Sequence, residues 1–92
     1  MAGESVIKEF LDKKTKSVKH DFTEHGRLWY RKNCIAYFDD DTDDLYINSC
    51  GWMTNTTKDR LNKIPNVHIQ QKQGIWYLNG NQWNGKLIKV ER

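Results

Sequence analysis

The sequence lacks the features that define several large classes of proteins. It has no apolar run near the roughly 18 residues that a membrane-spanning helix needs, and its start, Met1-Ala2-Gly3-Glu4, has neither the positive charge nor the apolar stretch of a signal peptide. Its two cysteines, Cys34 and Cys50, do not form the C-x-x-C pair of a metal site and are too few for a disulfide framework. We therefore expect a cytoplasmic protein with two buried thiols and no metal or cofactor.

The chain is also short. Its 92 residues, 37% of them hydrophobic, suffice for one modest core and a single domain over residues 1–92. Four Trp, four Tyr and three Phe are too many aromatic residues for a disordered chain. Since a domain of this size leaves little room for an enzyme cleft, we expect a non-enzymatic protein that acts through its surface.

The net charge of +3 conceals three regions of different charge. Residues 1–38 carry eight basic and five acidic side chains, residues 39–57 carry five acidic and no basic ones, and residues 58–92 carry seven basic and two acidic ones. The three sums are +3, −5 and +5, so a basic body carries one acidic segment. Such a body can attract nucleic acid or an acidic protein.

The first half of the chain predicts one helix and one hairpin. Val6, Ile7, Phe10 and Leu11 recur at helical spacing and predict a helix over residues 4–14. The polar residues 20–26 read as a connection. Residues 27–38 and 45–50 are rich in aromatic and branched side chains, so residues 27–50 predict a β-hairpin with an acidic tip at 39–44.

The second half predicts a short helix followed by strands. Thr56 is the expected N-cap of a helix over about 56–63, which Pro65 ends. Residues 67–90 predict three strands; a turn at Gln73-Gly74 separates the first two, and turns at Asn79-Gly80 and Asn84-Gly85 lie between the second and the third. The predicted class is α+β, in the order α-β-β-α-β-β-β, with a small, mostly antiparallel sheet and both helices packed on one face.

Residues 49–62 form the most distinctive segment, Ser-Cys-Gly-Trp-Met-Thr-Asn-Thr-Thr-Lys-Asp-Arg-Leu-Asn. This run, the later Gln-Lys-Gln-Gly-Ile-Trp-Tyr of residues 71–77 and the Trp-Asn-Gly of residues 83–85 resemble a signature of small proteins of tailed bacteriophages. The resemblance covers about residues 27–88, omits the N-terminal helix, and departs at Cys50, where a second glycine is expected. It implies a viral accessory protein that acts inside an infected bacterium, and it implies no role for any residue.

The start of the second helix is the first candidate site. Free backbone N–H groups there, the hydroxyls of Thr54, Thr56 and Thr57, and the cations of Lys58 and Arg60 together suit a phosphate. The spacing of a P-loop is absent, so nucleotide hydrolysis is not indicated. Alternatively, the threonines only cap the helix and the nearby tryptophan fills the core.

The second candidate is an alternation of basic and aromatic residues. Lysine and arginine neutralise phosphates and exposed rings stack on bases, so a sheet face of this composition can bind single strands. Alternatively, the rings form the core, and we expect two of the four tryptophans to be wholly structural. The residues concerned are Arg27, Trp29, Tyr30, Arg31 and Lys32, and later Lys72, Trp76, Tyr77, Trp83, Lys86 and Lys89.

The acidic residues 39–44 resemble a calcium loop only in part. The sixth position is Asp44 where that loop needs glycine, and the twelfth is Cys50 where it needs glutamate, so a solvated turn is the better interpretation. The turn can also mimic phosphates toward a basic partner or repel DNA. His20 and His25 are five residues apart, which does not suit two metal ligands on one helical turn.

Two functions remain open. The first is nucleic-acid binding. The second is an inhibitor or adaptor that binds a host or defence protein, with anti-restriction, anti-CRISPR or polymerase-directed activity, anchored by exposed aromatic and charged residues. The candidate contact residues for such a partner are Trp29, Trp76, Trp83, Asp40, Asp41 and Asp43. A small nuclease is a minor third possibility, because Asp21 and Glu24 near the two histidines are the sole local acid cluster outside the tip.

Overall fold

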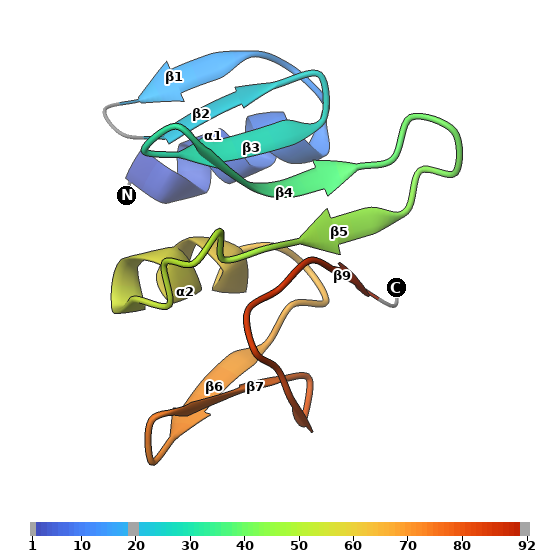
Figure 1. Ribbon diagram of the computed structural model, residues 1–92. Coiled ribbons are helices and arrows are strands. Elements are labelled where there is room, and N and C mark those ends of the chain that lie inside the picture. The colour runs from blue at the N-terminus through green and yellow to red at the C-terminus, as the bar shows by residue number, and fades with distance from the viewer. Residues whose placement is uncertain (1, 19–20, 91–92) are drawn as a thin grey trace.

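The computed structural model describes residues 2–18 and 21–90, which form two helices and nine strands (Figure 1). The strands make two antiparallel sheets, one in the order β1-β2-β3-β4-β5-β9 and the other in the order β6-β7-β8. The α+β class and the antiparallel pairing are therefore confirmed. The elements are α1 (Ala2–Leu11), β1 (Lys16–Val18), β2 (Asp21–Glu24), β3 (Arg27–Tyr30), β4 (Asn33–Phe38), β5 (Leu45–Ile47), α2 (Asn55–Asn62), β6 (Ile69–Lys72), β7 (Ile75–Leu78), β8 (Asn81–Gln82) and β9 (Ile88–Val90).

The predicted order of elements and the predicted helix packing were wrong. Five strands precede α2 and four follow it, and they belong to two sheets where one was expected. Helix α1 packs against β1, β2 and β3, whereas α2 contacts β4 and β6 and so lies between the two sheets. The two helices therefore do not share one face of one sheet.

The strands at the start of the large sheet explain the error in order. The segment predicted as a connection, residues 20–26, contains β2 and a turn at His25-Gly26; His20 lies outside the described residues. Residues 27–38 are two strands because Arg31 and Lys32 turn the chain back with φ of 49° and 70°. Two left-handed residues form a tight hairpin turn, but this conformation favours Asn and Gly, so the sequence gives no signal for it here.

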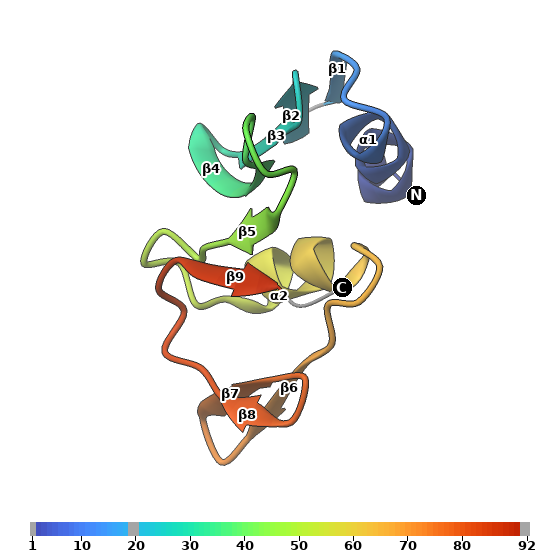
Figure 2. The same ribbon diagram turned by 90° about the vertical axis from the view of Figure 1, so that its right-hand side faces the viewer.

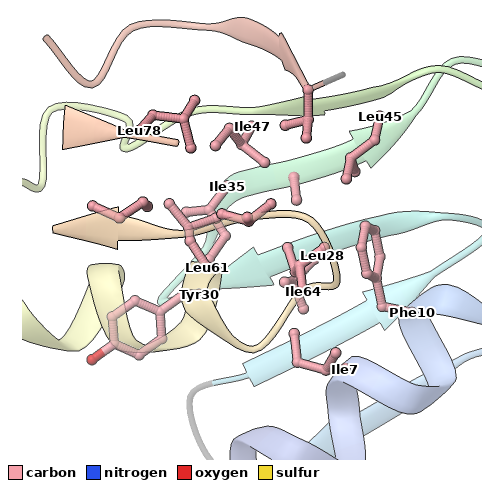
Figure 3. Close-up of a cluster of buried hydrophobic side chains, with 14 of the residues drawn as sticks. Ile7, Phe10, Leu28, Tyr30, Ile35, Leu45, Ile47, Leu61, Ile64 and Leu78 are labelled. Atoms are coloured by element: carbon pink, nitrogen blue, oxygen red, sulfur yellow. The ribbon is translucent and has the colours of Figure 1, made fainter. Parts of the chain in front are cut away.

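The hydrophobic core lies on the α1 side of the large sheet. Alternate residues of the strands point into it, as Leu28 and Tyr30 of β3 do. The same core receives Phe10 from α1 and Leu61 from α2 (Figure 3), and it extends along the chain from Val6 to Val90. Burial of these apolar side chains provides the main stabilising free energy.

The two turns of the small sheet are where the sequence predicts them, but the chain does not continue as predicted after the turn at Asn84-Gly85. Gln73-Gly74 and Asn79-Gly80 have positive φ at both residues and join β6, β7 and β8 as hairpins. Asn84-Gly85 was expected to lead into a further strand of the same sheet. Instead, the chain crosses to the large sheet, where β9 pairs with β5.

The helix boundaries shift by one to three residues from their predicted positions. Helix α1 ends at Leu11, because Lys13 adopts a left-handed conformation with φ of 58°. The N-cap of α2 is Thr54, whose side chain accepts a hydrogen bond from the N–H of Thr57, and not Thr56 as predicted. The first turn of α2 therefore starts closer to the loop that contains the exposed Trp52.

Candidate nucleic-acid interface

The large sheet has an outer face, which we define by Phe22, Trp29, Tyr37 and Tyr46. These side chains alternate with the buried ones along β2 to β5, and each is only partly buried. They form two cross-strand ring pairs: Phe22 and Trp29 have ring centroids 5.3 Å apart, and Tyr37 and Tyr46 stack at 5.2 Å. Figure 2 shows α1 on the opposite side of these strands, and no described helix covers the outer face.

Two cations border the outer face next to the tyrosine pair. Arg27 lies opposite Tyr37 in the strand register, and Lys89 lies opposite Tyr46. The acidic tip at 39–44 folds toward them, so that Asp40 lies 3.6 Å from Arg27 and Asp44 lies 3.6 Å from Lys89. Exposed ion pairs of this kind are weak.

The acidic tip itself is an exposed turn. The Asp39 carboxylate accepts hydrogen bonds from the backbone N–H groups of Asp41 and Thr42, and these bonds hold the pKa of Asp39 below its ordinary value. Asp43 pairs with Lys13 at the end of α1. Three cations of the body therefore lie against the tip, which makes the charge separation smaller than the sequence implies.

The other end of β3 carries unpaired positive charge. Arg31 and Lys32 form the β3–β4 turn, are both exposed, and have no carboxylate within ion-pair distance in the described part of the chain. Trp29 lies two residues before Arg31, about 6–7 Å along the strand. The outer face thus extends from its paired cations at the acidic tip to a turn whose two cations have no carboxylate partner among the described residues.

A pocket of about 340 Å³ lies on the other side of the same turn. Arg31 Nε donates to the Tyr30 hydroxyl at 3.1 Å, and Figure 3 shows this hydroxyl pointing away from the core. Hydrogen bonds from Thr56 and Arg31, with the nearby positive charge of Arg60, lower the pKa of Tyr30. The pocket is lined by Tyr30, Arg31, Asn33, Trp52, Thr54, Thr56 and Thr57.

Arg60 and Lys58 are held by other parts of the protein. Arg60 forms a two-pronged contact with the buried carboxylate of Asp21, at 3.0 Å and 3.4 Å, and its guanidinium lies 4.3 Å from the centre of the Tyr30 ring. Lys58 donates to Gln71 at 3.0 Å. Arg60 therefore connects α2 to the large sheet, and Lys58 connects it to the small sheet.

The structure brings some of the predicted site residues together and separates others. Thr54, Thr56 and Thr57 meet Arg31 around the pocket, and Lys32 lies beside it in the same turn. Lys72 lies on β6 of the small sheet, and Lys86 lies in the loop before β9. These two lysines are exposed but belong to neither the pocket nor the outer face.

The predicted exposure of Trp76 and Trp83 was wrong. Trp76 and Trp83 are only 2% and 5% exposed, so their rings are not available as contact residues; both fill the core beside the small sheet. Two structural tryptophans agree with the expectation. Trp52, which the alternative interpretation placed in the core, is instead 58% exposed.

Sequence reasoning missed Phe22, Tyr37 and Tyr46 as surface residues. Their signal was the two-residue periodicity, since each alternates with a buried neighbour on its strand. It also left open whether the two cysteines meet. Cys50 Sγ donates to the carbonyl oxygen of Cys34 at 3.0 Å, so they are neighbours. Both are only partly buried, so the expectation of two buried thiols was wrong, and this partial burial raises the pKa of both.

No helix in the described part of the chain is long and apolar enough to cross a membrane. No curated protein and no solved structure is significantly similar to the chain. A family model described as Kyanoviridae Gp96 protein matches residues 4–89, which extends the phage resemblance to include α1. The chain therefore belongs to the Kyanoviridae Gp96 family and is a small protein of tailed bacteriophages.

Proposed function

We propose that this phage protein binds single-stranded nucleic acid in the cytoplasm of the infected bacterium, without catalysing a reaction. One observation carries the proposal: four partly exposed aromatic rings form two pairs on a sheet face that no described helix covers. The protein has a separate core, so these rings are not needed to fill it.

The arrangement of the rings favours unpaired bases. Each ring exposes part of its surface, and base–aromatic stacking stabilises a complex by about 1–3 kcal/mol per base whatever the base. Bases inside a duplex are already stacked and paired, so they cannot lie flat on Trp29 or Tyr46. Single strands are therefore the expected ligand, with little sequence preference.

The charges indicate where on the outer face the nucleic-acid strand binds. At one end of the outer face, Arg27 and Lys89 already have carboxylate partners from the acidic tip, which repels phosphates. At the other end, Lys32 has no carboxylate within ion-pair distance in the described part of the chain, so its charge is available to phosphates. We expect the strand to lie over Trp29 and to contact the β3–β4 turn.

Fluorescence anisotropy with labelled strands tests this proposal. An oligonucleotide of about 12 nucleotides covers a typical single-strand site. Trp29→Ala should weaken binding by about 5- to 150-fold, which corresponds to the loss of one stacked base. Lys32→Gln should weaken it and lower the slope of log affinity against log salt by about 0.7.

Lys72→Gln is the matched control for Lys32→Gln, because it removes the same charge from an exposed position on the small sheet. It should leave the salt slope unchanged. Absence of binding to single-stranded DNA, single-stranded RNA and duplex at about 50 mM salt would overturn the proposal, because electrostatic attraction is strong at that concentration.

Binding to a host or defence protein is the second candidate function. The observation that favours it is a set of exposed apolar side chains, Trp52, Met53 and Leu87, which are 58%, 41% and 52% exposed. Tryptophan and methionine are enriched in protein interfaces. Affinity purification from infected cells separates the two functions: a host protein retained after nuclease treatment, and lost with Trp52→Ala but not with Trp29→Ala, would favour this one.

A further inference from the structure

We infer that the pocket between Trp52 and the β3–β4 turn binds one nucleotide unit, that is, a base with its phosphate, either free or at the end of a strand. This inference deepens the proposed function, on which it rests, by assigning a second and separate contact. The pocket volume of about 340 Å³ lies at the small end of ligand sites, which span about 300–1,000 Å³. That size suits a single nucleotide.

Trp52 provides the surface for the base. Its side chain is 58% exposed although it lines the pocket, and none of the described aromatic rings or cations stacks on it. The other large ring of the pocket, Tyr30, is almost fully buried and already stacks against Arg60. Trp52 is therefore the ring that a planar ligand can cover.

Arg31 provides the charge for the phosphate. Its Nε donates to the Tyr30 hydroxyl at 3.1 Å, which fixes the guanidinium at the pocket and leaves its terminal N–H groups for an anion. Arg27, Arg60 and Lys89 all have carboxylate partners, whereas Arg31 has none among the described residues. An arginine held in this way can form a two-pronged hydrogen bond with a phosphate.

The remaining wall determines what else the pocket can contact. The Thr54 hydroxyl lies 3.0 Å from that of Thr56 and 3.2 Å from that of Thr57, and Thr56 also bonds to Tyr30, so these groups bond within the protein and shape the wall. Asn33 donates from Nδ2 to the Arg31 carbonyl at 3.3 Å, and its amide oxygen remains able to accept a hydrogen bond from a base. Stacking and charge therefore carry the recognition, and base selectivity should be small.

Mononucleotide titration followed by NMR tests the pocket apart from the outer face. Adenosine 5′-monophosphate should shift the indole N–H signal of Trp52, assigned by its loss in Trp52→Ala. Adenosine and inorganic phosphate should each bind at least about tenfold more weakly than the whole nucleotide, because each lacks one of the two contacts. Trp52→Ala should weaken nucleotide binding by about 5- to 150-fold.

Two substitutions in one turn distinguish a pocket from general attraction. Arg31→Gln should weaken nucleotide binding, measured by the Trp52 shift, at least about tenfold, whereas Lys32→Gln removes the same charge from a residue that does not line the pocket and should weaken it little. Equal losses in the two variants, or no Trp52 shift at millimolar nucleotide, would overturn the inference. Circular dichroism of both variants establishes that they are folded.

The failures of the two proposals are distinguishable. Binding of strands through Trp29 without a nucleotide-induced Trp52 shift overturns the pocket and leaves the proposed function. A nucleotide-induced shift without strand binding overturns the proposed function and leaves the pocket. A 5′-phosphorylated strand that shifts Trp52 more than its unphosphorylated counterpart identifies the strand end as the source of the nucleotide, whereas a Trp52 shift with the mononucleotide and with neither strand identifies the free nucleotide.

Discussion

The two sheets use tryptophan in opposite ways. At the small sheet, Trp76 of β7 and Trp83, which directly follows β8, have ring centroids 6.0 Å apart, and they are 2% and 5% exposed. In the large sheet, Trp29 pairs with Phe22 at 5.3 Å, but both rings remain partly exposed. Similar ring pairs therefore serve as core in one sheet and as surface in the other.

The difference follows from what else each sheet has to bury. Three strands of two to four residues have few apolar side chains of their own, and Gln70, Gln71 and Lys72 of β6 are all exposed. The small sheet therefore needs both tryptophans, and Trp83 satisfies its indole N–H with the carbonyl of Lys86. The large sheet buries α1 against its inner face, so its core does not require the outer rings, which remain partly exposed.

Replacing one tryptophan in each sheet gives the largest expected effect. Trp76→Ala should lower the free energy of unfolding by about 3–5 kcal/mol, because it removes a buried ring and leaves a cavity. Trp29→Ala should lower it by about 1 kcal/mol, since a partly exposed cross-strand ring contributes less. Urea unfolding of both variants measures the difference. Equal losses would show that the outer face is part of the core.

The sequence predicted the elements that depend on local signals. The helix in residues 4–14 came from the spacing of Val6 and Phe10, and the hairpin turns of the small sheet came from their glycines. The turn at Arg31-Lys32 has no such signal, because its left-handed conformation is imposed by the pairing of β3 with β4. The return of β9 to β5 depends on contacts between residues about 40 positions apart, which local periodicity cannot reveal.

The sequence predicted the types of residue at the candidate site better than it predicted their positions in the fold. Arginine, lysine and aromatic residues in alternation predicted a candidate surface; the structure places Trp29 on the outer face with Arg27 at its border, and it places Arg31 at the pocket. Which tryptophans are exposed depends on how the two sheets meet, and the sequence does not encode that locally. Trp52 was expected in the core in one interpretation and lies at the pocket, while Trp76 and Trp83 were expected at a partner and lie in the core.

Neighbouring residues on β2 extend the comparison to the two faces of one strand. Asp21 faces inward, is 3% exposed and holds Arg60, whereas Phe22 faces outward. Asp21→Ala should lower the free energy of unfolding by about 2–3 kcal/mol, because it leaves the Arg60 charge partly buried and unpaired. Phe22→Ala should cost about 1 kcal/mol or less. Thermal unfolding measures both, and a larger loss for Phe22→Ala would contradict the assignment of the faces.

Neutralising the acidic tip tests whether its carboxylates weaken the binding of nucleic acid to the outer face. Replacing Asp40, Asp43 and Asp44 with asparagine should raise strand affinity about tenfold at low salt, since three exposed charge contacts contribute about 0.5 kcal/mol each. Folding stability should change little. Asp59→Asn is the control, because it removes a carboxylate on α2 that pairs with Lys63. Unchanged affinity in the tip variant would show that the strand does not approach Arg27 and Lys89.

The smallest effect concerns the thiols at the margin of the outer face. Cys34 lies opposite Trp29 in the register, and burial, with a smaller contribution from the neighbouring Cys50, raises its pKa above the ordinary 9.0. A thiol with a raised pKa in the folded state stabilises that state fully below the unfolded pKa, and this contribution is lost as pH rises through the folded pKa. Stability should therefore begin to decline above about pH 9.

The rate of alkylation measures the same rise in the pKa of Cys34 directly. At neutral pH the thiolate fraction of Cys34 is smaller than that of an unfolded cysteine, so a Cys50→Ser variant should react more slowly when folded than in urea. The pH at half-maximal rate should be higher in the folded protein. If Cys34 reacts equally fast in both states, β4 is fully hydrated beside Trp29, and the outer face is more open than its partly buried rings indicate. A bound oligonucleotide that covers Trp29 should slow the alkylation of Cys34, which would place the thiol at the interface.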